Sequence, residues 1–584
     1  MGLMDALHLG VSGLKTSQIS LNATAHNITN AETPGYVRQQ MLLTDFGYNN
    51  IGGNKISTWQ IGLGSDAQAL RQIRDQFLDQ SYRKETGRQG FYASQFEAAD
   101  EMQEVMGELE GVQFQNSIKD FWVTLQELAK EPDSIVTRST LIQNAVNFTN
   151  HAEKIYNQIA TYQIDLNTQI QQKVDRINEI GDEIRELNNR ICFYECNGQE
   201  HANDLRDKRN TLLDELGGLI DIKYREETDG KVSVQAEAIP FITEDHVFYM
   251  GTKPVSEDSD MIVPYWPSYG NAEVFNFDHT PNSVDNTDIG SLKGIVLARG
   301  RKVGKYTDIP SRPIRENFED DASYEEALAD FDIVTKKYNK EVNDSVVMSV
   351  QSQFDRLIHG IVTTINDILC PNKEVMLESG ETVLILDEEK AGVGMDADKT
   401  MGTELFARKS VSRYQEAQKI TLADGSQIVA RIYNKEDPSD NYSLYTLGEI
   451  TVNPDVLKDR SKLPLSKNTN TGDFDLDVAA DLLTAWQADF ETLNPNEKNY
   501  HNFNSYYTAL VGELGNRGEK YKTIADTQES MATCIDNERQ NVMAVSTDEE
   551  LTNMIKYQHA YNASARYVNV VSEMLEHIIT SLGH

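Results

Sequence analysis

The two ends of the chain carry apolar stripes at helical spacing. Near the start, leucine or isoleucine recurs every seven residues at Leu7, Leu14, Leu21 and Ile28. Near the end, steps of three and four alternate through Leu551, Met554, Gln558, Tyr561, Ala565, Val568, Ser572, Leu575, Ile579 and Leu582. Such spacing is the signature of a coiled-coil seam. The sequence therefore predicts a helix at each end whose apolar stripe must be covered by another helix.

Two kinds of partner could cover these stripes. An apolar stripe usually marks a core within its own domain, so pairing of the two ends within one chain stays open beside assembly with neighbouring copies. Intramolecular pairing would still leave Tyr557, Tyr567 and Ile578 on outer faces. We expect the terminal helix to cover 547–582, about 54 Å at 1.5 Å per residue. Thr547 and Glu550 have the spacing of a capping box at its start.

Charge and hydropathy exclude several classes of partner. The 584 residues include 54 basic and 92 acidic side chains, a formal net charge of −38. A field of that sign repels phosphate backbones, so we expect no nucleic-acid partner. No run of about 18 apolar residues is present, so we expect no membrane insertion. The first residues also lack the pattern of a cleavable secretory signal.

The first helix is predicted over residues 3–29 and is followed by a distinctive turn. Gly10 and Ser17 lie on the row beside the leucine stripe, where small side chains let another helix approach closely. In the segment 30–36, Thr33 precedes a proline and is pushed out of the helical region, and Gly35 accepts the positive φ of a turn. Residues 41–70 then look extended and punctuated by glycine.

The order of patterns along the chain predicts an α+β multidomain protein. Terminal coiled-coil-type helices and a long helical bundle enclose β-rich outer domains inserted in the middle, and residues 138–222 are read as an antiparallel helical hairpin. The expected domains are 1–45 with 546–584 (terminal), 46–222 with 477–545 (helical rod), 223–348 (β-rich) and 349–476 (a helix, then a second β-rich region).

No motif in the sequence predicts catalysis or a metal site. The segment 300–306 has the wrong spacing for a phosphate loop and is read as a basic loop. Asp396, Asp398 and Glu404 lack the spacing of a calcium loop and are read as a solvated turn. Cys192 and Cys196 have no second pair of ligands and are read as ordinary thiols. We therefore expect no catalytic residues, no metal and no cofactor.

Two segments together resemble a known family. Residues 21–39, LNATAHNITNAETPGYVRQ, and residues 555–566, IKYQHAYNASAR, are similar to the N- and C-terminal signatures of the flagellar axial proteins, which include rod, hook and hook-associated proteins. The ending 36–39 and the internal 204–210, DLRDKRN, look like the hook-associated branch. His26 and Thr29 depart from the commoner Asn and Ala of the signature.

The resemblance implies a structural role without catalysis. Members of this family leave the cytoplasm through the flagellar type III channel without a cleaved signal, and their ends become helical on assembly. It implies self-assembly into a ring-like layer, with hook protein below and a second junction protein and the filament above. An export chaperone would bind the C-terminal helix. Alternatives are a hook or distal-rod protein, or a flagellar scaffold whose aromatic-rich 240–280 region is adhesive.

The resemblance and the stripes nominate one set of assembly residues. Within it, Asn27, Asn30 and the turn 33–36 would set the angle between the inner helix and the outer domains. The full set is Leu7, Leu14, Leu21, Asn27, Ile28, Asn30, Thr33, Pro34, Gly35, Tyr36, Leu551, Ile555, Gln558, Tyr561, Ala565, Val568, Leu575, Ile579 and Leu582.

Overall fold

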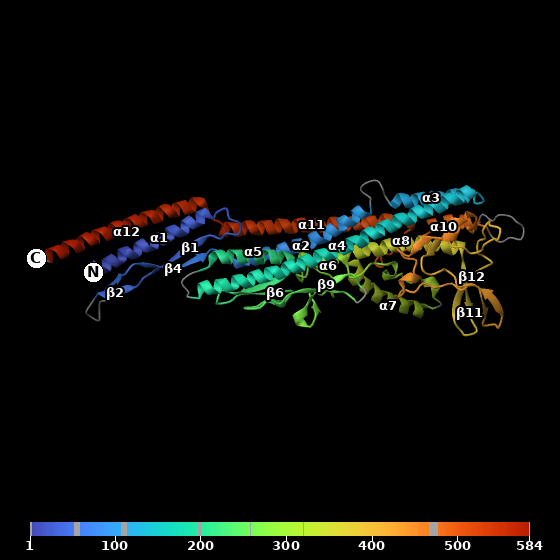
Figure 1. The fold of residues 1–584 in the computed structure, drawn as a ribbon, viewed down its shortest axis with the longest axis horizontal. Helices are drawn as coiled ribbons and strands as arrows, with labels where there is room; N and C mark the ends of the chain where they lie inside the picture. The colour runs from blue at the N-terminus through green and yellow to red at the C-terminus, as the bar shows by residue number, and fades with distance from the viewer. Residues whose placement is uncertain are drawn as a thin grey trace.

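The protein is a long rod with both chain ends at one pole. The computed structural model describes residues 3–51, 59–106, 114–196, 201–256, 259–318, 320–466 and 477–582. Helices α1 (Leu3–Thr29) and α12 (Thr547–Leu582) form that pole, and the remaining elements extend away from it (Figure 1). Their bounds equal the predicted ones, and the arrangement confirms an α+β multidomain fold. No helix in the described part of the chain has the length and hydropathy to cross a bilayer.

The two terminal helices pair with each other within the chain. They run antiparallel, because Gly10 lies against Val568 while Asn27, at the other end of α1, reaches Glu550. A Cβ added to Gly10 would lie 2.6 Å from the Val568 side chain, and one added to Gly13 would lie 2.7 Å from the Ser564 hydroxyl. Intramolecular pairing is therefore what the structure shows, and small residues permit it as predicted.

A β-ribbon runs beside the terminal pair. Strands β1 (Gln39–Asp45) and β4 (Ser65–Gln72) pair antiparallel, and β2 (Tyr48–Ile51) and β3 (Trp59–Gly62) continue the ribbon. The hydroxyl of Thr16 on α1 lies 3.2 Å from that of Ser65. The extended character predicted for 41–70 is confirmed in residues 41–51 and 59–70, and residues 52–58 lie outside the described part of the chain. We propose that the terminal domain reaches Gln72, beyond the predicted boundary at residue 45.

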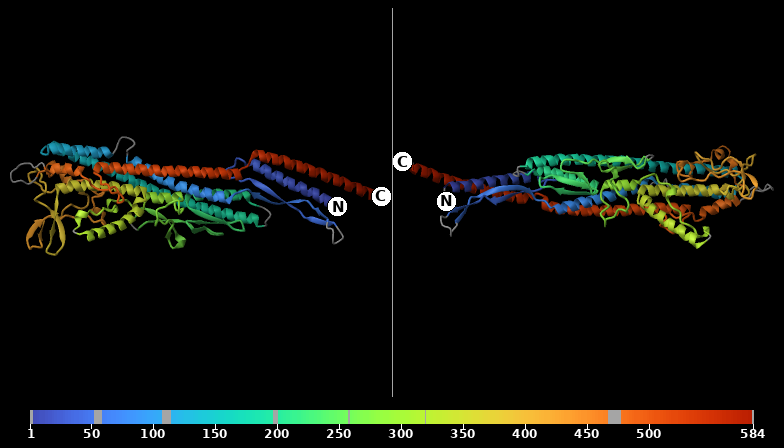
Figure 2. Two further views of the ribbon diagram at one scale, coloured as in Figure 1. Left: turned by 180° about the vertical axis from the view of Figure 1, so that it is seen from behind. Right: turned by 90° about the horizontal axis from the view of Figure 1, so that it is seen from below.

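Long helices form the rod. They are α2 (Gln76–Val105), α3 (Phe114–Lys130), α4 (Ile135–Glu195), α5 (Asn203–Leu219), α8 (Val346–Leu369), α10 (Asp477–Gln487) and α11 (Phe503–Met543). Helices α2 and α11 lie side by side, and α4 and α5 form the predicted hairpin (Figures 1 and 2). Most faces of α8 are buried in the same core as α3, α4 and α11. We therefore propose that α8 belongs to the rod rather than to an outer region.

Small antiparallel sheets lie along one side of the rod. Their strands are β5 (Ile222–Glu226), β6 (Val232–Ala236), β7 (Ile239–Ile242), β8 (Gly251–Pro254), β9 (Ile262–Trp266), β10 (Ala272–Glu273), β11 (Asn372–Met376), β12 (Thr382–Leu386), β13 (Phe406–Arg408), β14 (Gln418–Thr421), β15 (Gln427–Ala430) and β16 (Ile450–Val452). Helices α6 (Ser291–Arg299), α7 (Asp321–Tyr338) and α9 (Pro454–Lys458) accompany them. Strands β11 and β12 project at the pole opposite the chain ends (Figure 1).

Glycines allow three backbone segments to meet near the start of the rod. The Gly290 N–H, just before α6, donates to the Gly87 carbonyl of α2 at 2.8 Å. A Cβ added to Gly87 would lie 2.5 Å from the Gly217 carbonyl oxygen of α5, closer than real Cβ atoms approach. The crossing therefore holds α2, α5 and α6 at a separation that only glycine permits.

Replacing Gly87 with alanine should destabilise the rod. An alanine inside a helix ordinarily adds up to about 1 kcal/mol of stability relative to glycine. Here the clash with Gly217 should reverse the sign and cost about 1–3 kcal/mol, as overpacking of a close-packed core does. Thermal and urea unfolding of the rod would measure it. The control is Gly512→Ala on α11, where a Cβ meets nothing within 4 Å and a small gain is expected. Equal gains from both variants would contradict the clash.

Candidate functional site: the joint between the terminal helices and the rod

The leucine stripe of α1 is only partly covered, although it shares a face of the helix with Gly10, which contacts α12. Leu7, Leu14, Leu21 and Ile28 are all half-buried, whereas the buried side of α1 consists of Ala6, Gly10, Thr16, Ser17, Ser20, Ala23, Thr24 and Asn27. Gly10 and Gly13 let α12 approach closely, whereas Thr16 faces the β-ribbon, where its hydroxyl lies 3.2 Å from that of Ser65. Part of each leucine side chain therefore stays accessible to a neighbour.

The predicted stripe of α12 is divided between two faces. Ala565, Val568 and Leu575 are half-buried towards α1, while Gln558, Tyr561 and Ile579 are exposed. Leu551 and Ile555 are 46% and 56% exposed. Leu582 lies in α12, but its side chain is outside the described part of the structure. The predicted stripe includes Ser572, but this residue is exposed. Its neighbour Val571 is buried instead.

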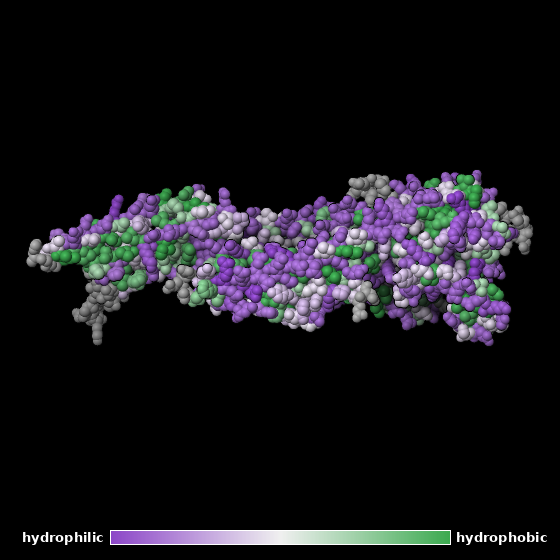
Figure 3. Space-filling view, in the orientation of Figure 1, coloured by the Kyte–Doolittle hydropathy of each residue, from purple (hydrophilic) through white to green (hydrophobic). Residues whose placement is uncertain are grey.

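A second apolar row on α12 lies beyond the predicted stripe. Tyr567, Val570, Met574 and Ile578 are all exposed and follow one another at steps of three and four. Space-filling Figure 3 shows hydrophobic side chains gathered over the two terminal helices. Of this row, only Tyr567 and Ile578 were predicted on outer faces, although their spacing from Val570 and Met574 could have revealed the whole row. Tyr557, predicted with them, is half-buried.

The turn after α1 has the predicted geometry. The Thr33 N–H donates to the Asn30 carbonyl at 3.0 Å, and the Tyr36 N–H donates to the Thr33 carbonyl at 3.1 Å. Gly35 has φ +77°, in the left-handed region that favours glycine. A Cβ there would lie 2.7 Å from the Thr211 hydroxyl of α5. Thr33, Pro34 and Gly35 are exposed, so the turn is open to solvent while its backbone direction is fixed.

Asn27 is the centre of the contacts that connect α1, the segment after the turn and α12. Its amide nitrogen donates to the Gln39 carbonyl at 2.9 Å and to a Glu550 carboxylate oxygen at 3.2 Å. Its amide oxygen accepts the Gln39 N–H at 3.0 Å and the Tyr36 hydroxyl at 2.8 Å. The side chain is 1% exposed. The buried amide thus uses its two donors and two acceptor positions, two of them on Gln39 and one each on Glu550 and Tyr36.

Tyr36 and His26 extend this arrangement towards the surface. The His26 Nδ1 atom lies 2.9 Å from the Tyr36 hydroxyl. Burial, together with the nearby Asp204, raises the pKa of Tyr36 well above its usual value. The hydroxyl therefore keeps its proton and remains a donor to Asn27. His26 is exposed, as the predicted polar face residue should be.

Arg38 holds the start of α12 to the same segment. Its Nε atom donates to Glu550 at 2.9 Å, and a second guanidinium nitrogen lies 2.9 Å from Glu549. The Arg38 N–H also donates to the Met543 carbonyl at 2.8 Å, at the end of α11. The predicted capping box is therefore wrong for Glu550, which is engaged by Arg38 and Asn27. Instead, the Ser546 hydroxyl accepts the Glu549 N–H at 3.4 Å.

Asp207 in the DLRDKRN segment connects these contacts to the rod. Its carboxylate accepts the Val37 N–H at 3.2 Å and the Gln72 amide at 2.7 Å. Burial raises the pKa of Asp207 to about 7, despite these hydrogen bonds. We call the set Asn27, Tyr36–Gln39, Asp207 and Glu550 the joint. It connects the terminal helices to α5 through backbone as well as side-chain atoms.

The two arginines of the same segment tie α5 to its neighbours in the rod. Arg206 lies 2.7 Å from Glu195 near the end of α4 and also contacts Glu226 on β5. The guanidinium of Arg209, only 2% exposed, donates to Asn188 at 3.0 Å and to the Gly230 carbonyl at 2.6 Å. The DLRDKRN segment therefore contacts the helical hairpin, the first sheet and the joint at once.

The raised pKa of Asp207 predicts a pH-dependent joint. Between its unfolded value near 3.8 and about 7, the folded state binds the proton more tightly, so stability should fall as pH rises through this window. The slope attributable to one group is at most about 1.4 kcal/mol per pH unit. Asp207→Asn, which keeps a hydrogen-bond acceptor without the charge, should remove that slope.

Urea unfolding of both proteins from pH 5 to pH 8 would measure this effect. Glu237, whose pKa burial also raises to about 7, contributes equally to the two proteins and cancels in the difference. Parallel curves for the two proteins across this range would contradict the prediction.

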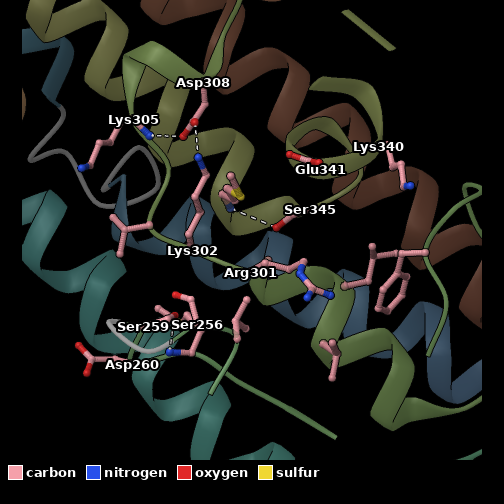
Figure 4. A pocket seen from close by; sticks show the side chains of 18 of the residues that line it. Ser256, Ser259, Asp260, Arg301, Lys302, Lys305, Asp308, Lys340, Glu341 and Ser345 are labelled. Carbon is pink, nitrogen blue, oxygen red and sulfur yellow. Dashed lines mark hydrogen bonds and ion pairs between the residues drawn. The ribbon is translucent and has the colours of Figure 1, made fainter. Parts of the chain in front are cut away.

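A cleft lies in the middle of the molecule, away from the joint. It encloses about 1200 Å³ and is lined by the 300–305 loop, by described residues between β8 and β9, by Glu273 of β10 and by the start of α8. Figure 4 shows Lys302 turned towards Asp308, and Arg301 lies 2.7 Å from Glu273. The basic loop prediction fits this geometry, in which basic side chains of the rim are neutralised by carboxylates of the same rim.

One acidic residue read as part of a solvated turn is buried. Glu404 is 7% exposed and accepts the Tyr445 hydroxyl at 2.6 Å. Asp396 does lie in a turn, where it accepts the Thr400 N–H at 2.9 Å. The solvated interpretation is therefore wrong for Glu404, whose tyrosine partner is too distant in sequence to be inferred locally. Among the described residues, no group of three potential ligands is placed to hold a metal ion.

Three family models match separate parts of the chain. The model described as flagellar hook-associated protein FlgK helical domain matches residues 99–370. The flagella basal body rod protein model matches 7–36, and the flagellar basal body rod FlgEFG protein C-terminal model matches 538–581. The two terminal matches coincide with α1 and α12, and together the three cover more than half of the chain.

Two relatives that match nearly the whole chain have the same name. The chain is 25% identical to flagellar hook-associated protein 1 of Bacillus subtilis, over 98% of this chain and 96% of the relative. It is 21% identical to the protein of that name in Escherichia coli, over 99% and 100%. The solved flagellar hook junction protein FlgK from Burkholderia pseudomallei has a TM-score of 0.51 at 11% identity, covering 80% of this chain and all of that one. The chain belongs to the flagellar axial protein family and, within it, to the hook-associated protein 1 group.

Proposed function

We propose that this protein is a structural adaptor of the bacterial flagellum that assembles on the distal hook and allows the filament to grow. The observation that carries the proposal is the terminal pair, in which the apolar rows of α12 remain exposed although α1 and α12 cover each other in part. Exposed apolar rows at helical spacing are stable only when neighbouring helices bury them. A layer of identical copies would supply those neighbours.

The joint supports the same role. A subunit that transmits torque between two tubes needs its inner helices fixed relative to its outer mass. Asn27, Arg38 and Asp207 provide this connection through buried hydrogen bonds and an ion pair rather than through one flexible linker. The proposal assigns no catalytic step and no cofactor to the chain.

The finer assignments extend this proposal. The copies would form a ring-like layer, with hook protein below and a second junction protein and the filament above. The protein would reach the extracellular tip through the flagellar type III channel, with an export chaperone bound to α12 before assembly. Asn27, Asn30 and the turn 33–36 would set the angle between the inner helices and the rod.

Deleting the gene would test the proposal. Mutant cells should keep intact hooks, lack filaments and release filament protein into the medium, and a plasmid copy should restore swimming. Electron micrographs and immunoblots of the medium would record each result. Normal filaments on the mutant would refute the junction role. Loss of the hooks themselves would favour the alternative of a hook or distal-rod protein. Counting copies per flagellum would also separate that alternative from a junction protein, because a hook protein is present in far larger number than one junction layer.

A further inference from the structure

An open groove of about 660 Å³ lies between α1 and the adjoining ends of α4 and α5. Its apolar lining comes from Ile19, Ala23, Leu70 and Leu205, and its polar lining includes Asn22, Arg190, His201, Lys208 and one acidic residue, Asp204. We call it the joint groove, because Gln39 of the joint also lines it. The groove is continuous with the contacts that fix the terminal helices to the rod.

Two cations of the joint groove have no partner in the described part of the chain. Arg190 and Lys208 are exposed, and neither forms an ion pair or hydrogen bond with a described residue. Most basic side chains around the joint are engaged, as Arg38 and Arg206 are. In a chain of net charge −38, free cations beside an apolar floor fit a surface that combines apolar and acidic side chains.

One surface of the same chain has that combination. Leu551 and Ile555 are 46% and 56% exposed, and Asp548 lies one turn before Leu551 without an ion pair to any described residue. At 3.6 residues per turn, Ile555 is about 140° around α12 from Val568, which contacts α1. We call Asp548, Leu551 and Ile555 the outer face of α12, because Leu551 and Ile555 are directed away from α1. Asp548 lies at the edge of this face and also lines a pocket with Ser20, Ala23 and Thr24 of α1.

The joint groove and the outer face lie on opposite flanks of the terminal pair. Asn22 in the groove is about 180° around α1 from Gly13, which contacts Ser564 of α12. They also lie at the same height. The contacts of Asn27 with Glu550 and of Gly10 with Val568 fix the antiparallel register, and this register places Ile555 level with Asn22. Two different patches at one height on opposite flanks are what a row of identical copies requires.

We propose that the outer face of α12 in one copy docks into the joint groove of the next copy. Leu551 and Ile555 would cover the apolar floor, and Asp548 would approach Arg190 and Lys208. The contact is head-to-tail, so each copy uses the outer face of α12 against one neighbour and the joint groove against the other. Successive contacts close into a ring if the rotation from one copy to the next divides a full turn. The inference rests on the proposed function and adds which two surfaces meet within the layer.

Disulfide trapping in assembled flagella would test the contact. The exposed Cys196 and Cys534, and the half-buried Cys192, are first replaced by serine, while the buried Cys370 is kept. Asn22→Cys and Thr552→Cys, at exposed positions in the groove and beside the outer face, are then introduced together. Oxidised flagella should yield a ladder of covalent dimers, trimers and larger species. Chains with either cysteine alone should yield no ladder, because the contact joins two different patches.

Charge reversal adds a second, independent readout. Lys208→Glu in the double-cysteine chain should lower the ladder yield several-fold, and adding Asp548→Lys should restore it. Lys520→Glu, an exposed lysine on α11, is the matched control and should leave the yield unchanged. Flagella that contain the protein but give no ladder would overturn the inference alone, as would equal ladders from single-cysteine chains. Absence of the protein from flagella would overturn the proposed function as well.

Discussion

Removing residues 547–584 should abolish filament growth while the rod stays folded. The large buried cluster runs from Ala98 to Leu514 and includes no residue of α12, so the rod should keep its thermal midpoint within about 2 °C. Helix α1 would lose its partner, and a lone helix with a small-residue face cannot repay its ordering cost. Far-UV circular dichroism should therefore lose the signal of both helices, 27 and 36 residues long.

Assembly of the truncated protein can be tested apart from its export. Purified truncated protein is added to hook-bearing cells of the deletion strain, together with filament monomers, and filaments are counted in micrographs. Full-length protein added in the same way is the control. We expect filaments only with the full-length chain. Filament growth on hooks supplied with the truncated protein would contradict the role given to α12.

Replacing Asn27 with leucine should release the terminal helices from the rod. The substitution keeps the branched side-chain shape but removes all four hydrogen bonds of the amide, leaving the Gln39 N–H and the Glu550 carboxylate without their buried partner. Each buried group left unsatisfied costs about 1–3 kcal/mol. The summed cost of about 3 kcal/mol or more should fall on α1 and α12, while the rod core is unaffected.

Hydrogen exchange of the full-length protein would locate the effect of Asn27→Leu. Protection should drop at least tenfold in α1 and α12 and stay unchanged in α4, and swimming should fail. Thr29→Ala is the control on the same helix, since Thr29 is exposed and its hydroxyl donates only to the Ala25 carbonyl. Unchanged protection in Asn27→Leu would show that the joint does not depend on this amide.

Local signals were sufficient for the terminal helices but not for the contact between them. The bounds 3–29 and 547–582 are confirmed because a long apolar stripe and the turn at Pro34 are both readable in sequence. The α1 contact with α12 uses Gly10 and Gly13, which carry no hydrophobic signal. Ile28 is five turns from Gly10, so the apolar stripe indicated the correct face of α1, and only the small side chains beside it indicated how closely α12 approaches.

The joint could be predicted in its parts but not in its connections. Asn27 and Tyr36 were nominated from the signature, and the DLRDKRN segment was noticed as a motif. The hydrogen bond from Val37 to Asp207 joins residues 170 positions apart, and no periodicity encodes such a pair. The position of α8 in the rod could not be predicted either, because an apolar helix has the same sequence pattern wherever it is placed in the fold.

The position of the chain ends has a practical consequence for labelling this protein. Both ends lie at the pole that carries the apolar rows (Figure 1), so a fluorescent tag or affinity peptide fused to either end would intrude on packing between subunits. The tight turn between β11 and β12 lies at the other pole, and Gly380 there has nothing within 4 Å of where its Cβ would be. A short epitope inserted at that turn would mark the molecule in living cells and leave the packing surfaces clear.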